Sequence, residues 1–251
     1  MNSSNVWRYI DCGPGRAAEN MRIDEDLLAQ ARMPGALPAL RFYAWDPPAV
    51  SIGRFQRPDA AVHADACAKR GFDIVRRITG GRAVLHYREL TYSVTAPDRY
   101  PLFPPEVIGA YKVIAAGLLA GFQNLGIPAE MVTRSGRHAA MVEKNGREAA
   151  CFSSPSWYEI VGAGKKIAGS AQRRVSGAFL QHGSILIDYD PLLEAEVIPG
   201  GSGPGRVTSI EQELGRKVSI DEVKQAFRAG FAHALGILFR DEQPQGRSDA
   251  G

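Results

Sequence analysis

The chain has 251 residues, of which 45% are hydrophobic and 23% are charged, and its formal net charge is +3. These values are typical of a soluble globular protein whose core is large enough to be stable without disulfides. The weak positive charge does not by itself indicate a nucleic-acid partner, although it would favour the docking of an acidic protein.

The three cysteines, Cys12, Cys67 and Cys151, are widely spaced and form neither a disulfide framework nor a CxxC pair. A reducing compartment is the simplest interpretation of this spacing. The first residues lack the apolar core of a signal peptide, and no run approaches the roughly 18 apolar residues that a membrane span needs. We therefore expect a cytoplasmic protein with no membrane or nucleic-acid partner.

The first half of the chain alternates helical and extended patterns. We expect a helix over 20–32, two strands joined by a Pro-Pro turn over 39–55, a helix over 58–71, β-branched runs on both sides of a Gly-Gly turn over 72–96, and a helix over 104–127. Asn20 is a candidate N-cap for the first helix, and Gly71 and Gly126 are candidate helix ends.

The second half is richer in strands. Short alternating runs separated by glycine turns, from "REAACFSS" to "GAFLQHGSILID", predict a meander. Two short helices should flank the Gly/Pro-rich loop at 199–205. A final helix over 219–237 should begin with Ser219 and Glu222 in capping-box spacing.

Strands and helices follow each other without a steady βαβ rhythm, which favours the α+β class over a doubly wound sheet. We expect a single catalytic domain over 1–240 and a polar tail over 241–251. The "GGSGPG" loop lacks the Gly-Lys-Ser/Thr of a phosphate-binding loop, and no zinc-ligand spacing is present, so we expect no metal.

Cys151 lies fifteen positions before Lys166. A thiol near pKa 8.5 is a weak nucleophile at neutral pH unless a positive neighbour favours its thiolate, and Lys166 would serve if a hairpin folded it back. The alternative is a small buried core residue beside a solvated lysine, and Cys12 and Cys67 are best interpreted as core residues.

Two further segments could carry chemistry. In "RRITGGRAVLH", two glycines let the backbone approach a ligand closely, and Arg76, Arg77 and Arg82 add positive charge. The alternative is an ordinary basic hairpin turn. His182 lies in a predicted strand, where a structural role is usual, although a Cys151–His182 dyad stays open on these grounds.

Several of these segments together resemble the signature blocks of the lipoate-protein ligase and octanoyltransferase superfamily. The matching blocks are "NMRIDEDLL", "RFYAWDPPAVSIGRFQ", "RRITGGRAVLHYRELTYS", "GKKIAGSAQRR" and "LQHGSILID". The resemblance extends from about residue 7 to residue 237, and "ACFSSPSWYEI" resembles the cysteine-dependent octanoyltransferase branch. It implies a two-layer α+β fold shared with biotin-protein ligases.

The resemblance also implies a site. Cys151 would carry the acyl thioester, and Lys166 would lower the pKa of its thiol. The substrate pocket would be formed by Arg77, Gly80, Gly81, Arg82, Ala83, Val84, His86, Gly169, Ser170, Ala171, His182 and Gly183. The implied donor is octanoyl-acyl carrier protein, the implied acceptor is a lipoyl-domain protein such as the glycine-cleavage H protein, and no cofactor is needed. We expect a monomer.

An ATP-dependent ligase is the alternative. Ligases of the superfamily resemble "RRxSGGGAVxHDxGN", whereas this chain has Arg82 at the third glycine and "YRELTYS" in place of the Asp-x-Gly-Asn tail. Both departures favour the transferase. A ligase working with a separate accessory subunit, ATP and Mg²⁺ stays open, as does a non-catalytic lipoyl-domain-binding module. The "TGGRAVLH" block and the cysteine argue against transfer of biotin.

Overall fold

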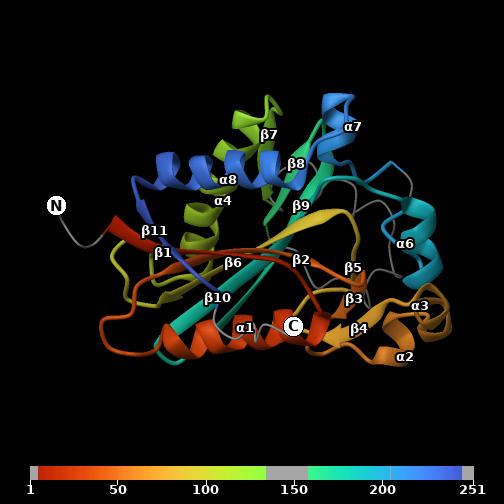
Figure 1. Cartoon of the computed structure of the whole chain (residues 1–251), viewed down its shortest axis with the longest axis horizontal. Helices are drawn as coiled ribbons and strands as arrows, with labels where there is room; N and C mark the ends of the chain where they lie inside the picture. Colours follow the sequence, from red (N-terminus) through yellow and green to blue (C-terminus); the bar gives the residue numbers. More distant parts are fainter. Residues whose placement is uncertain (1–4, 134–157, 204, 245–251) are drawn as a thin grey trace.

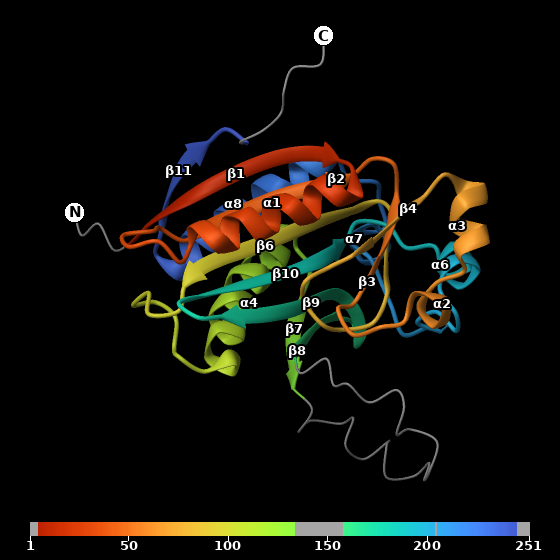
Figure 2. The same ribbon diagram turned by 90° about the horizontal axis from the view of Figure 1, so that it is seen from below.

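The computed structural model describes residues 5–133, 158–203 and 205–244. Figure 1 shows a large sheet with α4 and α8 on one face and α1 on the other, and Figure 2 shows the smaller sheet beside α1 with three short helices around it. This arrangement is the expected α+β architecture. Cys151 lies outside the described residues, so the structure does not test its predicted role.

The large sheet has eight strands in the order β11-β1-β2-β6-β10-β9-β8-β7. Its strands are β1 (Val6–Gly15), β2 (Ala39–Trp45), β6 (Glu89–Pro97), β7 (Ala129–Thr133), β8 (Tyr158–Gly162), β9 (Lys165–Val175), β10 (Ala178–Leu186) and β11 (Leu238–Glu242). The antiparallel series β8-β9-β10 confirms the last three runs of the predicted meander, and its first run, 147–154, lies outside the described residues. β11 pairs in parallel with β1 and ends at Glu242, whose carboxylate binds Arg8, so the ordered sheet reaches into the expected polar tail.

The small sheet contains β4 (Asp73–Arg76), β3 (Ala49–Ile52) and β5 (Val84–His86), with β3 in the middle. The runs on the two sides of the Gly-Gly turn therefore do not pair with each other as a hairpin, because both pair with β3. Short helices surround this sheet: α2 (Pro58–Ala61), α3 (Ala64–Arg70) and α6 (Pro191–Val197). The chain between residues 77 and 83 is consequently a loop that leaves one edge of the sheet and returns at the other.

α4 (Val107–Asn124) and α8 (Ile220–Leu235) pack closely against each other on the large sheet (Figure 1). Glycines permit this contact, since a Cβ on Gly121 would lie 2.4 Å from the ring of Phe227 and a Cβ on Gly230 would lie 2.4 Å from the backbone of α4. Of the described helices, only α4 has the length and mean hydropathy (1.2) of a membrane span. A core helix meets the same criteria, and the packing against α8 identifies α4 as one.

α1 (Ala17–Gln30) differs from its prediction at its start. Arg16 occupies the N-cap position, and Asn20 lies one turn inside the helix, where its side chain bonds the carbonyl oxygens of Gly15 and Ala44. The capping prediction for Asn20 is therefore wrong, because its amide holds the helix to β2.

Three other end predictions had mixed outcomes. The helix expected over 58–71 is interrupted between α2 and α3, but Gly71 ends it in the left-handed conformation as predicted. Ser219 caps α8 by accepting the backbone N–H of Glu222. The Glu222 side chain pairs with Arg216 and does not complete a capping box. α7 (Ile210–Leu214) and α6 are the two short helices expected around the Gly/Pro-rich loop.

Candidate active site

The Gly-Gly loop of the small sheet lies against β10 of the large sheet. Thr79 at the start of this loop hydrogen-bonds His182 on β10, with 2.7 Å between Oγ1 and Nε2. Arg173 on β9 donates to the carbonyl oxygen of Ile78, at 3.1 Å. These contacts join the "TGG" and "QHG" segments, which the sequence comparison with the superfamily had placed in one pocket.

His182 is fixed from its other side by Asp24 of α1. The distance between His182 Nδ1 and Asp24 Oδ2 is 2.9 Å, so both ring nitrogens of His182 have partners. Buried partners on both sides therefore fix the orientation of the His182 ring beside the Gly-Gly loop.

Asp24 is the centre of a buried polar network. Its carboxylate also accepts hydrogen bonds from Arg41 (2.8 Å), Tyr43 (3.0 Å) and Ser93 (2.8 Å). Burial raises the pKa of Asp24, but the nearby Arg41 guanidinium and the hydrogen bonds from His182 and Ser93 outweigh burial and hold it below its usual value. The network therefore contains an ionised carboxylate that fixes β2, β6 and β10 relative to α1.

Arg77 organises the Gly-Gly loop from within. Its guanidinium donates to the carbonyl oxygens of Ser51, Gly80 and Arg82, and it is only 7% exposed. Burial lowers its pKa to about 10. Arg77 thus holds the loop backbone in shape, and its donors are already occupied by protein acceptors.

The other members of the loop differ in their surroundings. Gly81 adopts φ +95°, and its carbonyl oxygen lies so close to Gly53 that a Cβ there would be 2.0 Å away. A Cβ added at Gly80 would meet nothing within 4 Å. The Arg82 side chain leaves the loop to contact the carbonyl oxygen of Gly201 at 3.3 Å. Gly80 is therefore the part of the loop with free space beside its backbone.

Ala83 and Val84 continue from the loop into the small sheet. Ala83 packs against the core of that sheet, and Val84 begins β5 opposite Ser51. His86 is buried at the end of β5, where Nε2 bonds Ser51 Oγ at 2.7 Å and Nδ1 bonds Glu89 at 3.1 Å. Burial lowers the pKa of His86 although the neighbouring Glu89 carboxylate acts in the opposite direction, and the lowered pKa favours a neutral ring.

Lys166 lies at the start of β9 and pairs with Glu159 of β8, with 3.0 Å between Nζ and Oε1. Its side chain, 36% exposed, crosses the backbone at Gly169, where an added Cβ would lie 2.7 Å from Cε and 2.9 Å from Nζ. Gly169 therefore provides the space in which the ammonium lies. The glycine of "IAGSA" is thus explained by the position of the lysine that precedes it.

Strand pairing divides the predicted pocket residues between two faces. Gly169 pairs with Ser184 and Ala171 pairs with His182, and directly paired residues share a face, so these lie on the side of α1 and the small sheet. Ser170 and its partner Gly183 lie on the opposite face, where the Ser170 hydroxyl contacts Tyr92 at 2.6 Å. The Ser170 side chain therefore does not join the predicted pocket, and its carbonyl oxygen accepts a hydrogen bond from Tyr111 of α4 at 3.3 Å.

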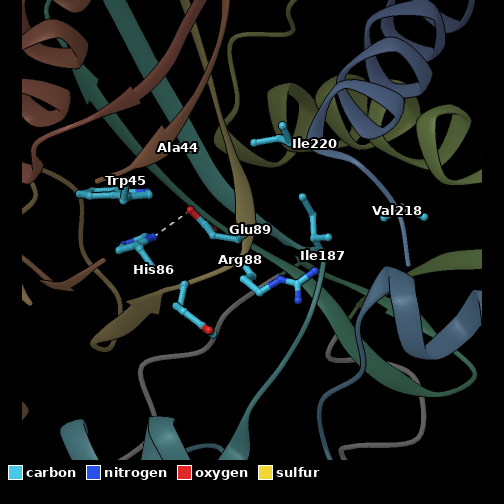
Figure 3. Close-up of a pocket in the computed structure, with 9 residues that line it drawn as sticks. Ala44, Trp45, His86, Arg88, Glu89, Ile187, Val218 and Ile220 are labelled. Carbon is cyan, nitrogen blue, oxygen red and sulfur yellow. Dashed lines mark hydrogen bonds and ion pairs between the residues drawn. The ribbon is translucent and has the colours of Figure 1, made fainter. Parts of the chain in front are cut away.

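A cavity of about 270 Å³ opens at the edge of this region (Figure 3). Trp45 and His86 stack at its one side, 3.9 Å apart, and Ile187, Val218 and Ile220 form the apolar opposite side. Of the residues predicted for the substrate pocket, only His86 borders this cavity. Within the described residues, no cluster of three His, Cys, Asp or Glu side chains could hold a metal ion.

Sequence reasoning did not single out Asp24, Ser51, Thr79 or Glu159. Asp24 had a signal, since it occupies the apolar stripe of α1 between Met21 and Leu28, where an acidic residue is unusual unless it is paired. Glu159 had no comparable signal, because it meets Lys166 only through the pairing of β8 with β9. Cys12 and Cys67 are buried, as predicted.

The sequence was compared with protein families and with known proteins. The sequence matches the family "Lipoyl protein ligase A/B catalytic domain" over residues 16–232. It is 45% identical to "Octanoyltransferase LipM" of Symbiobacterium thermophilum over 94% of this chain and 89% of that protein. The corresponding protein of Bacillus subtilis is 40% identical over 92% of this chain and 87% of that protein.

Solved structures show the same fold. "Lipoate-protein ligase A bound with ATP" superposes with a TM-score of 0.78 at 27% identity, covering 96% of this chain and 90% of that chain. The putative lipoate protein ligase of T. acidophilum with bound lipoic acid gives 0.75 at 26% identity, with the same coverage. The expected fold is confirmed, and the chain belongs to the lipoyl protein ligase A/B catalytic-domain family.

Proposed function

We propose that this protein moves an octanoyl group from octanoyl-acyl carrier protein to a lysine of a lipoyl-domain protein, through a thioester on Cys151. The relationship to LipM octanoyltransferases over more than nine-tenths of the chain supports octanoyl transfer in lipoate biosynthesis. The cysteine intermediate, the acyl carrier protein donor and the glycine-cleavage H protein as acceptor are the finer parts of the proposal. We also propose that the enzyme acts as a cytoplasmic monomer.

The position of Lys166 is the observation that carries the mechanism. Its ammonium lies over the bare backbone of Gly169, on the face where the Thr79–His182 contact joins the Gly-Gly loop to β10. A positive charge there would favour the thiolate of an approaching cysteine, and each unit by which the thiol pKa falls corresponds to about 1.36 kcal/mol. Glu159 balances this charge while no thiolate is present.

The transfer then takes two steps. The Cys151 thiolate attacks the carbonyl carbon of the donor thioester, the new C–S bond forms, and the phosphopantetheine thiolate leaves and takes up a proton. The amine of the acceptor lysine attacks the resulting octanoyl-Cys151, an amide forms, and the Cys151 thiolate is released. The proton that the amine loses passes to the released Cys151 thiolate, because the Lys166 ammonium is already protonated.

Backbone groups of β9 would stabilise the oxyanion in both steps. β8 pairs with β9 only as far as Ala168, so the edge of β9 from Gly169 onward faces no described strand. An N–H group directed at a developing negative charge in a site shielded from water is an effective catalyst. We place this role at Gly169–Ala171.

The proposal requires an apolar environment for the acyl chain. Burial of its methylene and methyl groups at about 0.8 kcal/mol each would give several kcal/mol, less the cost of ordering the chain. Because the donor is already an activated thioester, we propose that the reaction needs no ATP, metal or other cofactor.

Exposed arginines near the Gly-Gly loop would dock acidic partner proteins. Arg54 and Arg57 are exposed, and Arg82 lies at the surface beside Gly201. Arg77 is buried and does not take part in this surface. Arg76 donates to three carbonyl oxygens of the loop that contains Arg54.

The ATP-dependent ligase is a second candidate, because the ATP-bound lipoate-protein ligase A is a close structural neighbour. Purified protein would be given H protein with either octanoyl-acyl carrier protein alone or octanoate and ATP. Our proposal requires octanoylated H protein in the first mixture and its loss in Cys151→Ala and Lys166→Ala. Product in the second mixture only, unaffected by Cys151→Ala, would assign the protein to the ligases.

A further inference from the structure

Phe55 is the most exposed large apolar side chain in the described part of the chain, at 85%. It lies in the turn over residues 53–57 that connects β3 to α2, at the end of the molecule away from β11 (Figure 1). The guanidinium carbon of Arg54 lies 5.5 Å from the centre of its ring. Neither the hydrophobic core nor the mechanism above uses this ring.

Hydrogen bonds fix the backbone of this turn. Arg76 donates to the carbonyl oxygens of Gly53, Arg54 and Gln56, each at 2.9 Å. The Gln56 side chain accepts from the N–H of Gly53 at 2.9 Å, and the N–H of Arg54 donates to the carbonyl oxygen of Thr79 at 2.8 Å. A single exposed apolar side chain is common on protein surfaces. An aromatic ring on a fixed turn is suited to binding, because little further chain entropy is lost when a partner contacts it.

The surface that contains Phe55 is positively charged. Arg54 and Arg57 are exposed in the same turn, and Arg82 is exposed in the Gly-Gly loop that the turn contacts. Arg57 pairs with Asp59 at 2.7 Å, whereas no ion pair among the described residues includes Arg54 or Arg82. Aromatic residues and arginine are enriched at protein interfaces, and unpaired arginines complement an acidic partner.

The separation of this turn from Lys166 favours the acyl donor over the acceptor as that partner. The Lys166 ammonium lies beside Gly169 of β9. The turn is joined to the large sheet through Thr79, which bonds His182 opposite the position two residues beyond Gly169. A carrier protein seated on the turn spans this separation with its long phosphopantetheine arm. An acceptor lysine is short, so its domain has to dock closer to Lys166.

We propose that Phe55 is the anchor of a docking surface for the acyl carrier protein, on which Arg54 and Arg82 pair with carboxylates of that protein. This inference rests on the proposed function and names the surface that its donor uses. The Phe55 ring packs against apolar side chains of the carrier protein, and the arginines steer its approach. No covalent bond changes at this surface, so it determines the binding of the donor and not the chemical steps.

The test measures the binding of fluorescently labelled holo-acyl carrier protein, without an acyl group, to full-length wild type, Phe55→Ala, Phe55→Tyr and Arg54→Ala at low and high salt. Leu238→Ala and Arg240→Ala are the matched controls, because both side chains are exposed on β11, the edge strand away from the turn (Figure 1). Transfer from octanoyl-acyl carrier protein to H protein gives kcat and the KM for each of the two proteins. Thermal melting gives the Tm.

We expect Phe55→Ala to raise both the dissociation constant and the KM of the carrier protein about 30-fold, the scale of an interface hot spot, with kcat unchanged. Phe55→Tyr should keep most of the affinity, since the ring is retained. Arg54→Ala should weaken binding about 2- to 5-fold at low salt and by less at high salt, because salt screens an exposed charge. All variants should keep the wild-type Tm and the wild-type KM for H protein, and both controls should bind the carrier protein as the wild type does.

Wild-type affinity of Phe55→Ala for the carrier protein would overturn the inference, while octanoyl transfer by the wild type would leave the proposed function intact. A higher KM for H protein alone would also overturn it, because the surface would then dock the acceptor. Equal losses of affinity in Phe55→Ala and Leu238→Ala would contradict a local anchor. Failure of the wild type to transfer octanoyl from the carrier protein would refute the proposed function, and the inference with it.

Discussion

Substitution of the buried ion pair between Asp24 and Arg41 tests how the fold supports the site. Both side chains are almost fully buried, at 1% and 0% exposure, and their nearest N and O atoms are 2.8 Å apart. Substitution Asp24→Asn keeps the size of the side chain but removes its charge. Arg41 would then be a buried cation without a counter-ion, and the new amide NH₂ would face donors where Oδ2 now accepts from Tyr43 and His182.

The cost of this substitution follows from the burial. Removal of one partner from a buried ion pair typically costs about 3–5 kcal/mol. For a chain of this size, a loss of 1 kcal/mol lowers Tm by about 2–4 °C, so we expect Asp24→Asn to melt about 6–20 °C below the wild type. The loss of His182 orientation should also loosen the Thr79 loop and reduce acyl transfer in the variant that remains folded.

Thermal melting of three variants checks the reasoning. Asp26→Asn is the matched control, because Asp26 lies in the same helix and pairs with Arg22 at the surface, where the expected change is within about 0.5 kcal/mol. The double variant Asp24→Asn/Arg41→Gln should recover part of the loss, since the uncompensated charge is gone. Equal melting temperatures for Asp24→Asn and Asp26→Asn would refute the claim that the buried pair stabilises this site.

The remaining predictions concern the two sides of the site. Gly169→Ala should reduce acyl transfer strongly and stability little, because its methyl displaces only the flexible Lys166 side chain. Gly183→Ala should lower the free energy of unfolding by about 1–3 kcal/mol or more, since its methyl would lie 2.3 Å from a backbone oxygen. Melting and activity assays that find the two variants alike would contradict this difference. Glu159→Gln should change the free energy of unfolding by less than about 1 kcal/mol, because the pair with Lys166 is half-exposed, and a Tm fall beyond a few degrees would show that the pair is structural. Burial holds the pKa of His86 below its unfolded value of 6.5, so the unfolded chain binds the proton more readily, and the stability that the neutral His86 ring contributes is present above pH 6.5 and is lost as the pH falls below it. The Tm of His86→Gln should therefore depend less on pH between 7 and 5 than the Tm of the wild type. Parallel curves of Tm against pH for the two proteins would contradict this assignment.

Local rules predicted the ends of elements where one residue decides the outcome. Gly71 ends α3 because only the left-handed conformation closes that helix, and Ser219 caps α8 through its own hydroxyl. The same rules failed for Asn20, whose side-chain amide could cap a helix but instead donates from within α1 to the carbonyl oxygen of Ala44 in β2. Tertiary contacts decided that case, and local spacing contains no information on them.

The candidate site shows a similar division. Spacing and resemblance singled out Lys166 and His182, and the structure places them on one face of the large sheet. Arg77 was expected to contact substrate, but burial turns its donors toward the carbonyl oxygens of its own loop. Partners such as Glu159 and Asp24 belong to other elements, so only the folded pairing of strands and α1 reveals them.

The central claim is that an acyl group is held on Cys151 beside Lys166 without ATP. Intact mass of the wild type, Cys151→Ala and Lys166→Ala, each mixed with octanoyl-acyl carrier protein alone, tests it most directly. The account predicts an added octanoyl mass on the wild type that hydroxylamine removes, no adduct on Cys151→Ala, and slow or absent acylation of Lys166→Ala. An adduct that survives in Cys151→Ala, or no adduct on the wild type until octanoate and ATP are supplied, would contradict it.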